Sequence, residues 1–598
     1  MGTAFARTGR FDGQLRLRAP RQGALRQMVV CVGSQTTRGK PQLSVLSSFL
    51  AALGIRVLES RTKSGIARVA LPAQHVNHRT ITFDALVPLG DTSEAPAAPS
   101  YTLLSISSRP EKPTRGSTLQ SALYIVVLVS IAAALLAVAV FRTLRVKTKA
   151  DYLVAGRSLP AIVLVLTLLT SWIGAGSLFA GAENAYKNGF AALWQPAGGW
   201  LGLLLIYFIA PRARKFAQFT LPDLLEARYN QAARVLGTIA ILVAYVAITS
   251  YQFKGGGNVL HLIFPDSVTP ELGTYIIAMF VILTTALAGM SSVAYMDVAI
   301  GSLVTVICII ATPMLFFKAG GWAGLHAALP PTHFEVLGNL TLLRALEFLV
   351  PTMLLMLGNQ VMYQKFFSAK SERDASISVV GWILGTLLLE TLIVAIAVFG
   401  SALYPTGEVA RQPYEIIPYT ARHGLPAFMG ALLLGAVFAK VISTASNYLF
   451  SPASNLVEDV FVRYIAPGAS NKRVLIVSRL AVVLLGCWAL YQAIYAPSIL
   501  EKMLYAYTIY SAAVTPVVLA AFYSKRATAW GAVAAIASGT VVTLLWDAPG
   551  FKQFLHLPAL LANRDAIFPA LFVAVAALVA VSAFTPKPTP EQLAKFAD

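Results

Sequence analysis

The sequence predicts an all-α polytopic membrane protein with about 13 transmembrane helices. Of its 598 residues, 57% are hydrophobic and 12% are charged, whereas about 25% of the residues of a soluble domain are charged. Apolar runs of roughly 20 residues, each long enough to cross a bilayer as a helix, recur between Val126 and Ala583. The runs are continuous rather than alternating, which favours helices over strands.

The thirteen predicted spans follow one another with short polar connections. They are 119–141, 159–186, 190–211, 234–262, 271–289, 293–317, 343–364, 375–403, 424–457, 474–495, 499–523, 528–546 and 565–585. Spans two to six form one predicted five-helix repeat (about 159–317), and spans seven to eleven form the other (about 343–523). The matching span counts and breaks predict an inverted repeat with discontinuous first helices.

Lysine and arginine are unevenly distributed between the two sides. The connections after the odd-numbered spans carry 21 of them, and the opposite side carries nine. The richer side is expected in the cytoplasm. The sequence thus predicts an integral plasma (inner) membrane protein with its N-terminus outside and a short C-terminal tail, 589–598, in the cytoplasm.

Residues 1–118 stand apart from the transmembrane domain at 119–588. They hold 16 Lys/Arg and six Asp/Glu, a net charge of +10, which is half of the +20 of the whole chain. Export of such a basic segment without a secretory signal conflicts with an outside N-terminus. We expect either a disordered tail or small extra domain, or a segment absent from the native product, with translation starting near Leu119; the second is preferred.

Two spans contain interruptions near their centres. Span two reads "LTLLTSWIGAGSLFAGAENAY", and span seven reads "FLVPTMLLMLGNQVMYQKFF". Glycine and proline ease unwinding, and the freed backbone carbonyls need partners that lipid cannot provide. Small-residue packing between helices is the alternative for span two alone, but broken helices at matching positions of two halves indicate a transporter with a site near the midplane.

The ninth span carries a polar stripe on an apolar helix. Lys440, Ser443, Thr444, Asn447 and Ser451 fall at i, i+3, i+4, i+7 and i+11 and share one face. Such a stripe faces the bundle interior or water rather than lipid. The paired hydroxyls could join unwound carbonyls of the second span to form a five-oxygen nest for an alkali cation; alternatively, they bond back to their own helix.

Six motifs in order resemble the sodium/solute symporter family, whose members have the leucine-transporter-like inverted-repeat fold. They are "DYLVAGRSLP", "FTLPDLLEARYN", "YQFKGGGN", "GMSSVAYMDVAIGS", "YQKFFSAKSERDA" and "VISTASNYLFSPASNLVEDVF", within about 151–530. The resemblance implies Na⁺ as the coupling ion. The implied sodium ligands are the carbonyls of Thr170, Ile173 and Lys440 and the hydroxyls of Ser443 and Thr444.

The resemblance also implies a substrate site between the broken helices. Its expected residues are Trp172, Ser177, Gln195, Thr352, Leu355 and Met356. Sugar-transporting members carry Asn and Tyr where Thr352 and Leu355 stand, which favours an organic acid, an amino acid or a similar solute over a sugar. Asp297, near the predicted cytoplasmic end of its span, is expected to be a structural cap or loop anchor.

Lys440 departs from the family pattern, in which this position is usually small. Three interpretations stay open. The side chain snorkels to an aqueous vestibule, it pairs with an intramembrane carboxylate such as Glu390, or its ammonium replaces sodium and couples transport to protons.

The predicted function is sodium-coupled secondary active symport that imports a small organic solute by alternating access. A proton-coupled or sodium-independent transporter in which Lys440 replaces the cation is the alternative, and a solute sensor is a remote one. We expect no enzyme activity, no cofactor besides Na⁺ and no nucleic-acid partner; the expected partners are the solute and membrane lipid. The sequence does not predict an oligomeric state.

Overall fold

The computed structural model describes five strands within residues 58–110 and most of the chain from Arg115 onwards. From there it omits residues 144–147, 217–219, 496–497, 547, 549, 557–561, 563, 595 and 597–598. The chain divides into two compact units, Met1–Thr118 and Leu119–Asp598. Each unit is described by itself.

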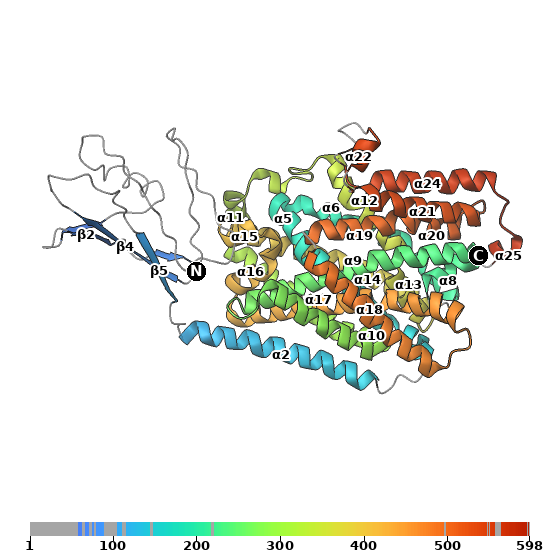
Figure 1. Ribbon diagram of the computed structural model, residues 1–598, viewed down its shortest axis with the longest axis horizontal. Helices are drawn as coiled ribbons and strands as arrows, with labels where there is room; N and C mark the ends of the chain where they lie inside the picture. Colours follow the sequence, from blue (N-terminus) through green and yellow to red (C-terminus); the bar gives the residue numbers. More distant parts are fainter. Residues whose placement is uncertain are drawn as a thin grey trace, which may run out of the picture. The chain divides into compact units, whose positions relative to one another are not determined.

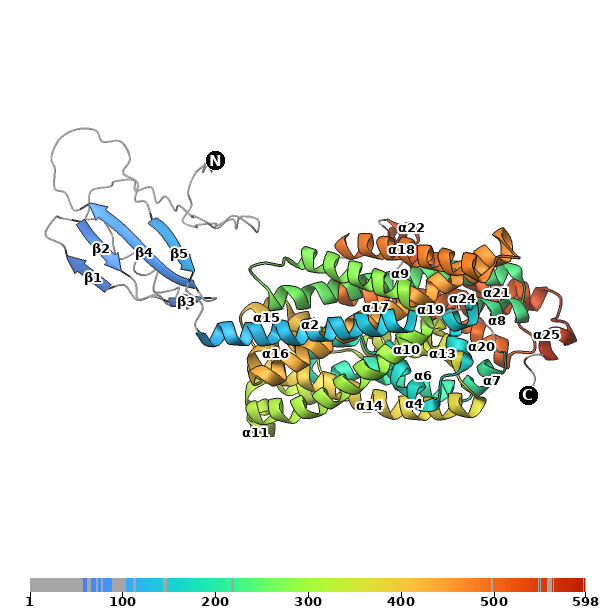
Figure 2. The ribbon, with the colours of Figure 1, turned by 90° about the horizontal axis from the view of Figure 1, so that it is seen from below.

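The first unit contains one antiparallel sheet (Figure 2). Its strands are β1 (Leu58–Arg61), β2 (Ile66–Ala70), β3 (Gln74–Val76), β4 (Arg79–Pro88) and β5 (Leu104–Pro110). The order is β1-β2-β4-β3, with β5 also paired to β4. The boundary after Thr118 coincides with the predicted start of the transmembrane domain. Whether 1–118 belongs to the native product stays a prediction, and the rest of that segment lies outside the described residues.

The second unit is helical (Figure 1). In chain order its first half contains α2 (Arg115–Thr143), which begins just before the boundary, α3 (Lys149–Val154), η1 (Ala155–Arg157), α4 (Ala161–Trp172), η2 (Gly176–Gly181), α5 (Ala182–Asn188), η3 (Gly189–Leu193), α6 (Trp194–Ile206), α7 (Ala210–Phe216), α8 (Leu221–Arg228), α9 (Gln231–Ile263), α10 (Pro270–Lys318), α11 (Gly321–Ala328) and η4 (Pro331–Phe334).

The second half continues in the same way. It contains α12 (Leu342–Gly358), α13 (Gln360–Ser368), α14 (Glu372–Leu403), α15 (Glu408–Arg411), η5 (Pro413–Glu415), α16 (Ile416–Gly424), α17 (Ala427–Asn455), η6 (Leu456–Ile465), α18 (Asn471–Tyr495), α19 (Ile499–Ala513), α20 (Thr515–Tyr523), α21 (Ala529–Trp546), α22 (Phe551–Phe554), α24 (Ile567–Phe584) and α25 (Pro590–Ala594).

Among the described residues, eleven helices are long and apolar enough to cross a membrane, and two shorter apolar helices cover Ala122–Val138 and Ala161–Trp172. The all-α polytopic class is therefore confirmed for the second unit, while the count of thirteen spans stays a prediction. The predicted separation of spans five and six is confirmed. Gly289 interrupts α10 with φ 68° and ψ 175°, and a Cβ there would lie 2.7 Å from the Tyr152 ring.

The first predicted break lies between α4 and η2. The α-helix ends at Trp172, and Ile173 adopts an extended backbone with φ −80° and ψ 115°. The helical conformation resumes in the π-helix η2. The freed Ala175 N–H donates to Gln252 Oε1 of α9 at 2.7 Å. The glycines of "YQFKGGGN" allow this approach, since a Cβ at Gly255 would lie 2.9 Å from Ala175 Cβ.

The second predicted break lies between α12 and α13 at Asn359, whose backbone is also extended. Its side-chain Oδ1 accepts from Val361 N at 3.0 Å and from Tyr245 Oη at 2.9 Å, and its Nδ2 donates to Tyr448 Oη at 2.9 Å. Tyr510 Oη donates to Gly358 O at 2.6 Å and accepts from Gln360 N at 3.0 Å. Both predicted breaks are thus present.

Helix α17 lies in the interior of the second unit. It packs against α4, α9, α10 and α13, and every residue from Leu433 to Asn455 is buried. The polar stripe therefore faces protein and not lipid, as the sequence predicts.

A cluster of ion pairs joins α8, α9 and η6. The Arg234 guanidinium contacts Asp223 at 2.6 Å and Asp459 at 2.7 Å, and it also pairs with Glu226. Arg463 of η6 contacts Glu226 at 2.5 Å. Asp459 is fully buried and also accepts from Thr220 Oγ1 at 2.9 Å. One guanidinium thus ties a helix of the second repeat to two helices of the first.

Candidate functional site

The hydroxyl of Thr444 sits where α17 meets the first broken helix. Its Oγ1 lies 3.1 Å from Thr170 O, 2.9 Å from Ile173 O and 3.0 Å from Lys440 O. The extended backbone at Ile173 frees the carbonyls of Thr170 and Ile173, whereas Lys440 O belongs to α17 itself. Close packing brings α17 to the break, since a Cβ at Gly174 would lie 2.7 Å from Thr444 Cγ2. Four of the five predicted sodium ligands therefore meet at one point.

This arrangement has more acceptors than protons. A hydroxyl carries one proton and can donate one full hydrogen bond, whereas three carbonyl oxygens lie within 3.1 Å of Thr444 Oγ1. Lys440 O already accepts within α17, so the proton can serve Thr170 O or Ile173 O but not both, and one freed carbonyl faces the hydroxyl oxygen without a proton between them. A hard monovalent cation suits such a set of neutral oxygens.

Ser443, the fifth predicted ligand, has a different partner. Its Oγ donates to Asp297 Oδ1 of α10. Asp297 is fully buried and also accepts from Thr167 Oγ1 at 2.5 Å and from Asn447 Nδ2 at 3.1 Å. Lys365 Nζ of α13 lies 3.4 Å from Asp297 Oδ2.

The expectation that Asp297 is a cap near the end of its span is therefore wrong. The helix after Gly289 has begun by Ser292, so Asp297 lies inside it and turns toward α4 and α17. Lys365 also lies at this point, although no role was predicted for it. Its ammonium donates to Thr167 O at 2.7 Å and to Ser171 Oγ, and the sequence signal for it is a lysine directly after the apolar span seven.

The Lys440 side chain is fully buried, and its Nζ donates to Leu169 O of α4 at 3.2 Å. In this conformation the ammonium does not snorkel to an aqueous vestibule, because no part of it is exposed. Nor does it pair directly with Glu390, since no ion pair within 4.0 Å joins them among the described residues and Glu390 Oε1 accepts from Ser177 Oγ at 2.8 Å. Two of the three interpretations of Lys440 thus disagree with its position.

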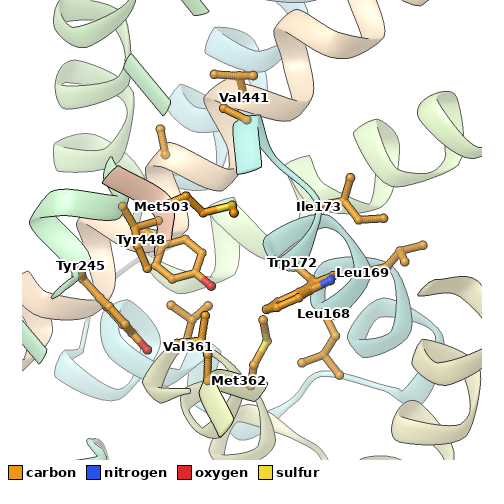
Figure 3. Close-up of a cluster of buried hydrophobic side chains, with 14 of the residues drawn as sticks. Leu168, Leu169, Trp172, Ile173, Tyr245, Val361, Met362, Val441, Tyr448 and Met503 are labelled. Atoms are coloured by element: carbon orange, nitrogen blue, oxygen red, sulfur yellow. The ribbon is translucent and has the colours of Figure 1, made fainter. Parts of the chain in front are cut away.

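The oxygens of Thr444, Thr170, Ile173 and Lys440 are called the nest below. Most of the predicted substrate residues lie beside it. Trp172 ends α4, and a Cβ at Gly199 of α6 would lie 3.3 Å from its ring and 3.7 Å from Met356 Cε. Gln195 Nε2 contacts Met503 Sδ of α19 at 3.5 Å. Figure 3 shows Trp172 and Met503 among apolar side chains from α4, α9, α13 and α17. The two broken helices therefore meet here, as predicted.

Two predicted substrate residues, Thr352 and Leu355, have no described contact with this group. The Thr352 hydroxyl donates to Phe348 O of its own helix at 2.7 Å. Leu355 is fully buried, and no described contact joins its side chain to Trp172, Ser177 or Gln195. Gln252 and Glu390, in contrast, contact the broken helix directly; Gln252 was part of a quoted motif but received no role.

Among the described residues, no group of three or more His, Cys, Asp or Glu could hold a metal ion. The oxygens around Thr444 are all neutral. This donor set fits an alkali ion and not a transition metal, which prefers imidazole or thiolate ligands.

Comparison with known proteins gives one consistent result. The chain is 27% identical over 464 residues to a sodium/proline symporter of Staphylococcus aureus, covering 73% of this chain and 88% of the relative. The homologous protein of strain JH9 gives the same identity over 463 residues.

The solved structure of a Na⁺-coupled sialic acid symporter, in a substrate-bound outward-open state, superposes with a TM-score of 0.66 over 78% of this chain and 98% of that chain. Its identity of 19% makes this likeness a finding about the fold alone. The sequence profile of the sodium:solute symporter family matches residues 152–539, which is well over half of the chain. The chain therefore belongs to the sodium:solute symporter family.

Proposed function

We propose that the oxygens around Thr444 form the cation site through which this chain couples solute transport to sodium. As a family member, the chain is a transporter and not an enzyme, and it moves a small solute together with sodium across the membrane. The observation that carries the proposed site is the surplus of carbonyl acceptors around one hydroxyl. The proposed ligands are the carbonyls of Thr170, Ile173 and Lys440 and the Thr444 hydroxyl.

Ser443 completes this site by rotating its hydroxyl from Asp297 to the cation. A sodium ion among these oxygens would bridge the end of α4 to α17 and so stabilise one packing of the two helices. Solute then binds among Trp172, Ser177, Gln195 and Met356, and rocking of the two repeats carries both to the other side. Sodium and solute must bind with different free energies to the outward-open and inward-open conformations, and this difference couples the solute gradient to the sodium gradient.

Lys440 acts in this proposal as a resident positive charge beside the ion. Family membership favours sodium over the alternative in which the ammonium replaces it, and it also favours a symporter over the solute sensor. The ammonium repels a nearby cation by about 2–3 kcal/mol for charges ~6–8 Å apart at an effective dielectric constant of about 20. We therefore propose that Lys440 lowers the sodium affinity and holds α17 on Leu169 O.

The test is uptake by proteoliposomes that contain purified protein, with imposed sodium or proton gradients. Uptake of the transported solute should follow the sodium gradient, and K440M should reach half-saturation at a sodium concentration roughly 10–100-fold lower. Uptake that follows a proton gradient in the wild type and is lost in K440M would instead assign coupling to the ammonium.

The proposed orientation has the N-terminus outside and the C-terminus in the cytoplasm of the plasma (inner) membrane. The Lys/Arg excess of the connections after odd-numbered spans supports it. Labelling of single cysteines introduced at Lys187 and Lys525 in intact cells tests it. A membrane-impermeant reagent should modify the first and not the second.

A further inference from the structure

Glu390 is a buried carboxylate that contacts the second half of the first broken helix. It lies on α14 and is 4% exposed. Its Oε1 accepts from Ser177 Oγ of η2 at 2.8 Å. Because Ser177 follows the break by only a few residues, the carboxylate lies where the predicted solute site meets η2.

No cation within the described residues neutralises Glu390 by direct contact. The Lys440 ammonium is near enough for the two charges to interact, but it donates to Leu169 O. Lys365 is committed to Asp297. A carboxylate in the interior of a membrane helix bundle without a paired cation is costly, and a positive group from outside the chain would reduce that cost.

The neighbours of Glu390 suit a cationic nitrogen. Trp172 lies beside the carboxylate, and its ring stacks on Tyr507 with centroids 6.2 Å apart. Aromatic faces attract cations through the ring quadrupole. The positions that flank these rings are small, since a Cβ at Gly176 would lie 3.2 Å from Tyr507 Oη.

An unused acceptor on α6 faces η2 one turn after Ser177. Gln195 Oε1 is buried and has no hydrogen-bond partner among the described residues. It would lie 3.6 Å from a Cβ at Gly181, four residues after Ser177. A buried polar group left unpaired costs about 1–3 kcal/mol, and an N–H group of the solute would satisfy this acceptor.

The buried charges around the site also balance. Between α4, α10, α13, α14 and α17 the described buried ionisable side chains with a formal charge are Asp297, Glu390, Lys365 and Lys440. Two negative and two positive charges leave this region neutral. With the coupling ion bound, a zwitterionic solute adds no further charge, whereas a simple amine adds a second positive one.

We propose that Glu390 binds the protonated amine of a zwitterionic solute, with Gln195 Oε1 as a second acceptor for its N–H groups. This assignment rests on the proposed solute site and narrows its substrate class. It excludes organic acids without an amine, which the sequence alone left open. Glu390 is then a specificity-determining residue that contacts the solute directly.

The experiment measures ligand-induced shifts of thermal unfolding of the purified full chain in detergent with sodium chloride. The probes are matched sets: an amino acid such as L-proline, the acid that lacks the amine (cyclopentanecarboxylate), and the amine that lacks the acid (pyrrolidine). A set is built in the same way for each member of an amino-acid panel. At least one amino acid should stabilise the wild type, while its two half-analogues should not. E390Q should bind that amino acid roughly 10–100-fold more weakly.

Two controls make the result specific. E335Q, which neutralises an exposed carboxylate of the loop after η4, should behave like the wild type. E390Q should keep the shift caused by sodium alone, which reports that the nest and the fold are intact. If E390Q does not fold, E390D keeps the charge and should still prefer the amino acid to its deaminated analogue.

The proposal is overturned if the deaminated acid stabilises the wild type as well as the amino acid does. It is also overturned if E390Q binds the amino acid with unchanged affinity. A failure of the proposed sodium site looks different, because sodium alone would then shift no variant.

Discussion

The two broken helices resolve the same backbone problem in different ways. At the second break, the Asn359 and Tyr510 side chains pair with Val361 N, Gln360 N and Gly358 O, at 2.6–3.0 Å. At the first break, the freed carbonyls of Thr170 and Ile173 share the single proton of Thr444. The second break is completed by the protein itself, whereas the first has acceptors to spare.

This difference separates permanent structure from a ligand-dependent contact. A break whose groups are all paired gains nothing from an ion, because a cation there would have to displace existing donors. A break with surplus acceptors gains a favourable contact each time a cation enters. The inverted repeat thus places one structural break and one proposed binding break at related positions in its two halves.

The largest expected effect comes from removing the hydroxyl at the first break. T444V deletes one proposed ligand and leaves the carbonyls facing a methyl group, so the sodium concentration at half-maximal uptake should rise roughly 10–100-fold. Sodium titration of solute uptake in proteoliposomes measures it. T540V makes the same chemical change on α21, where the hydroxyl bonds to Ile536 O of its own helix at 2.7 Å, and should leave the titration unchanged. Equal titrations for T444V and the wild type would remove the proposed ion from this nest.

The next effect tests the second break. N359A leaves the Tyr245 and Tyr448 hydroxyls and Val361 N without their partner, which should lower the free energy of unfolding by about 2–3 kcal/mol. Unfolding in detergent, followed by tryptophan fluorescence with and without sodium, measures it. The stabilisation by sodium should persist in N359A. If sodium no longer stabilises this variant, the two breaks are not independent and the comparison is wrong.

Gln252 tests whether the first break also needs protein support. Q252L removes the acceptor of the Ala175 N–H, so stability should fall by about 1–2 kcal/mol. Because Ala175 lies two residues after Ile173, the carbonyl of Ile173 also becomes less well positioned, and the sodium affinity should fall by less than in T444V. Both quantities come from the same unfolding and uptake assays. A sodium affinity lower than that of T444V would make Gln252, and not Thr444, the main determinant.

The smallest effect concerns the charged cluster, which holds its helices by ion pairs instead of neutral oxygens. Burial acts to raise the pKa of Glu226, but hydrogen bonds and charges from Arg234 and Arg463 outweigh it, so the pKa lies below its usual value. The stability from this group is present at neutral pH and is lost as the pH falls through the folded-state pKa. The unfolding temperature of the wild type should therefore fall below about pH 4. The unfolding temperature of E226Q should depend less on pH in that range. The same pH dependence of stability in the wild type and E226Q would show that Glu226 does not contribute to it.

The periodic features of the site could be predicted from the sequence, and its tertiary features could not. The stripe of Lys440, Ser443 and Thr444 follows from helix period, and both breaks follow from Gly, Pro and Asn in apolar runs. Asp297 was misplaced because its depth depends on where α10 resumes after Gly289. The partner of Ser443 could not be predicted either, since it comes from a helix far away in the chain.

The charged cluster has a consequence for how that end of the molecule can open. Asp459 of η6 is fully buried and shares the Arg234 guanidinium with two carboxylates of α8. If η6 moves away from α9, at least one carboxylate loses its cation in a medium of low polarity. Water must then hydrate that carboxylate in place of the lost ion pair. These helices therefore separate only as water enters between them.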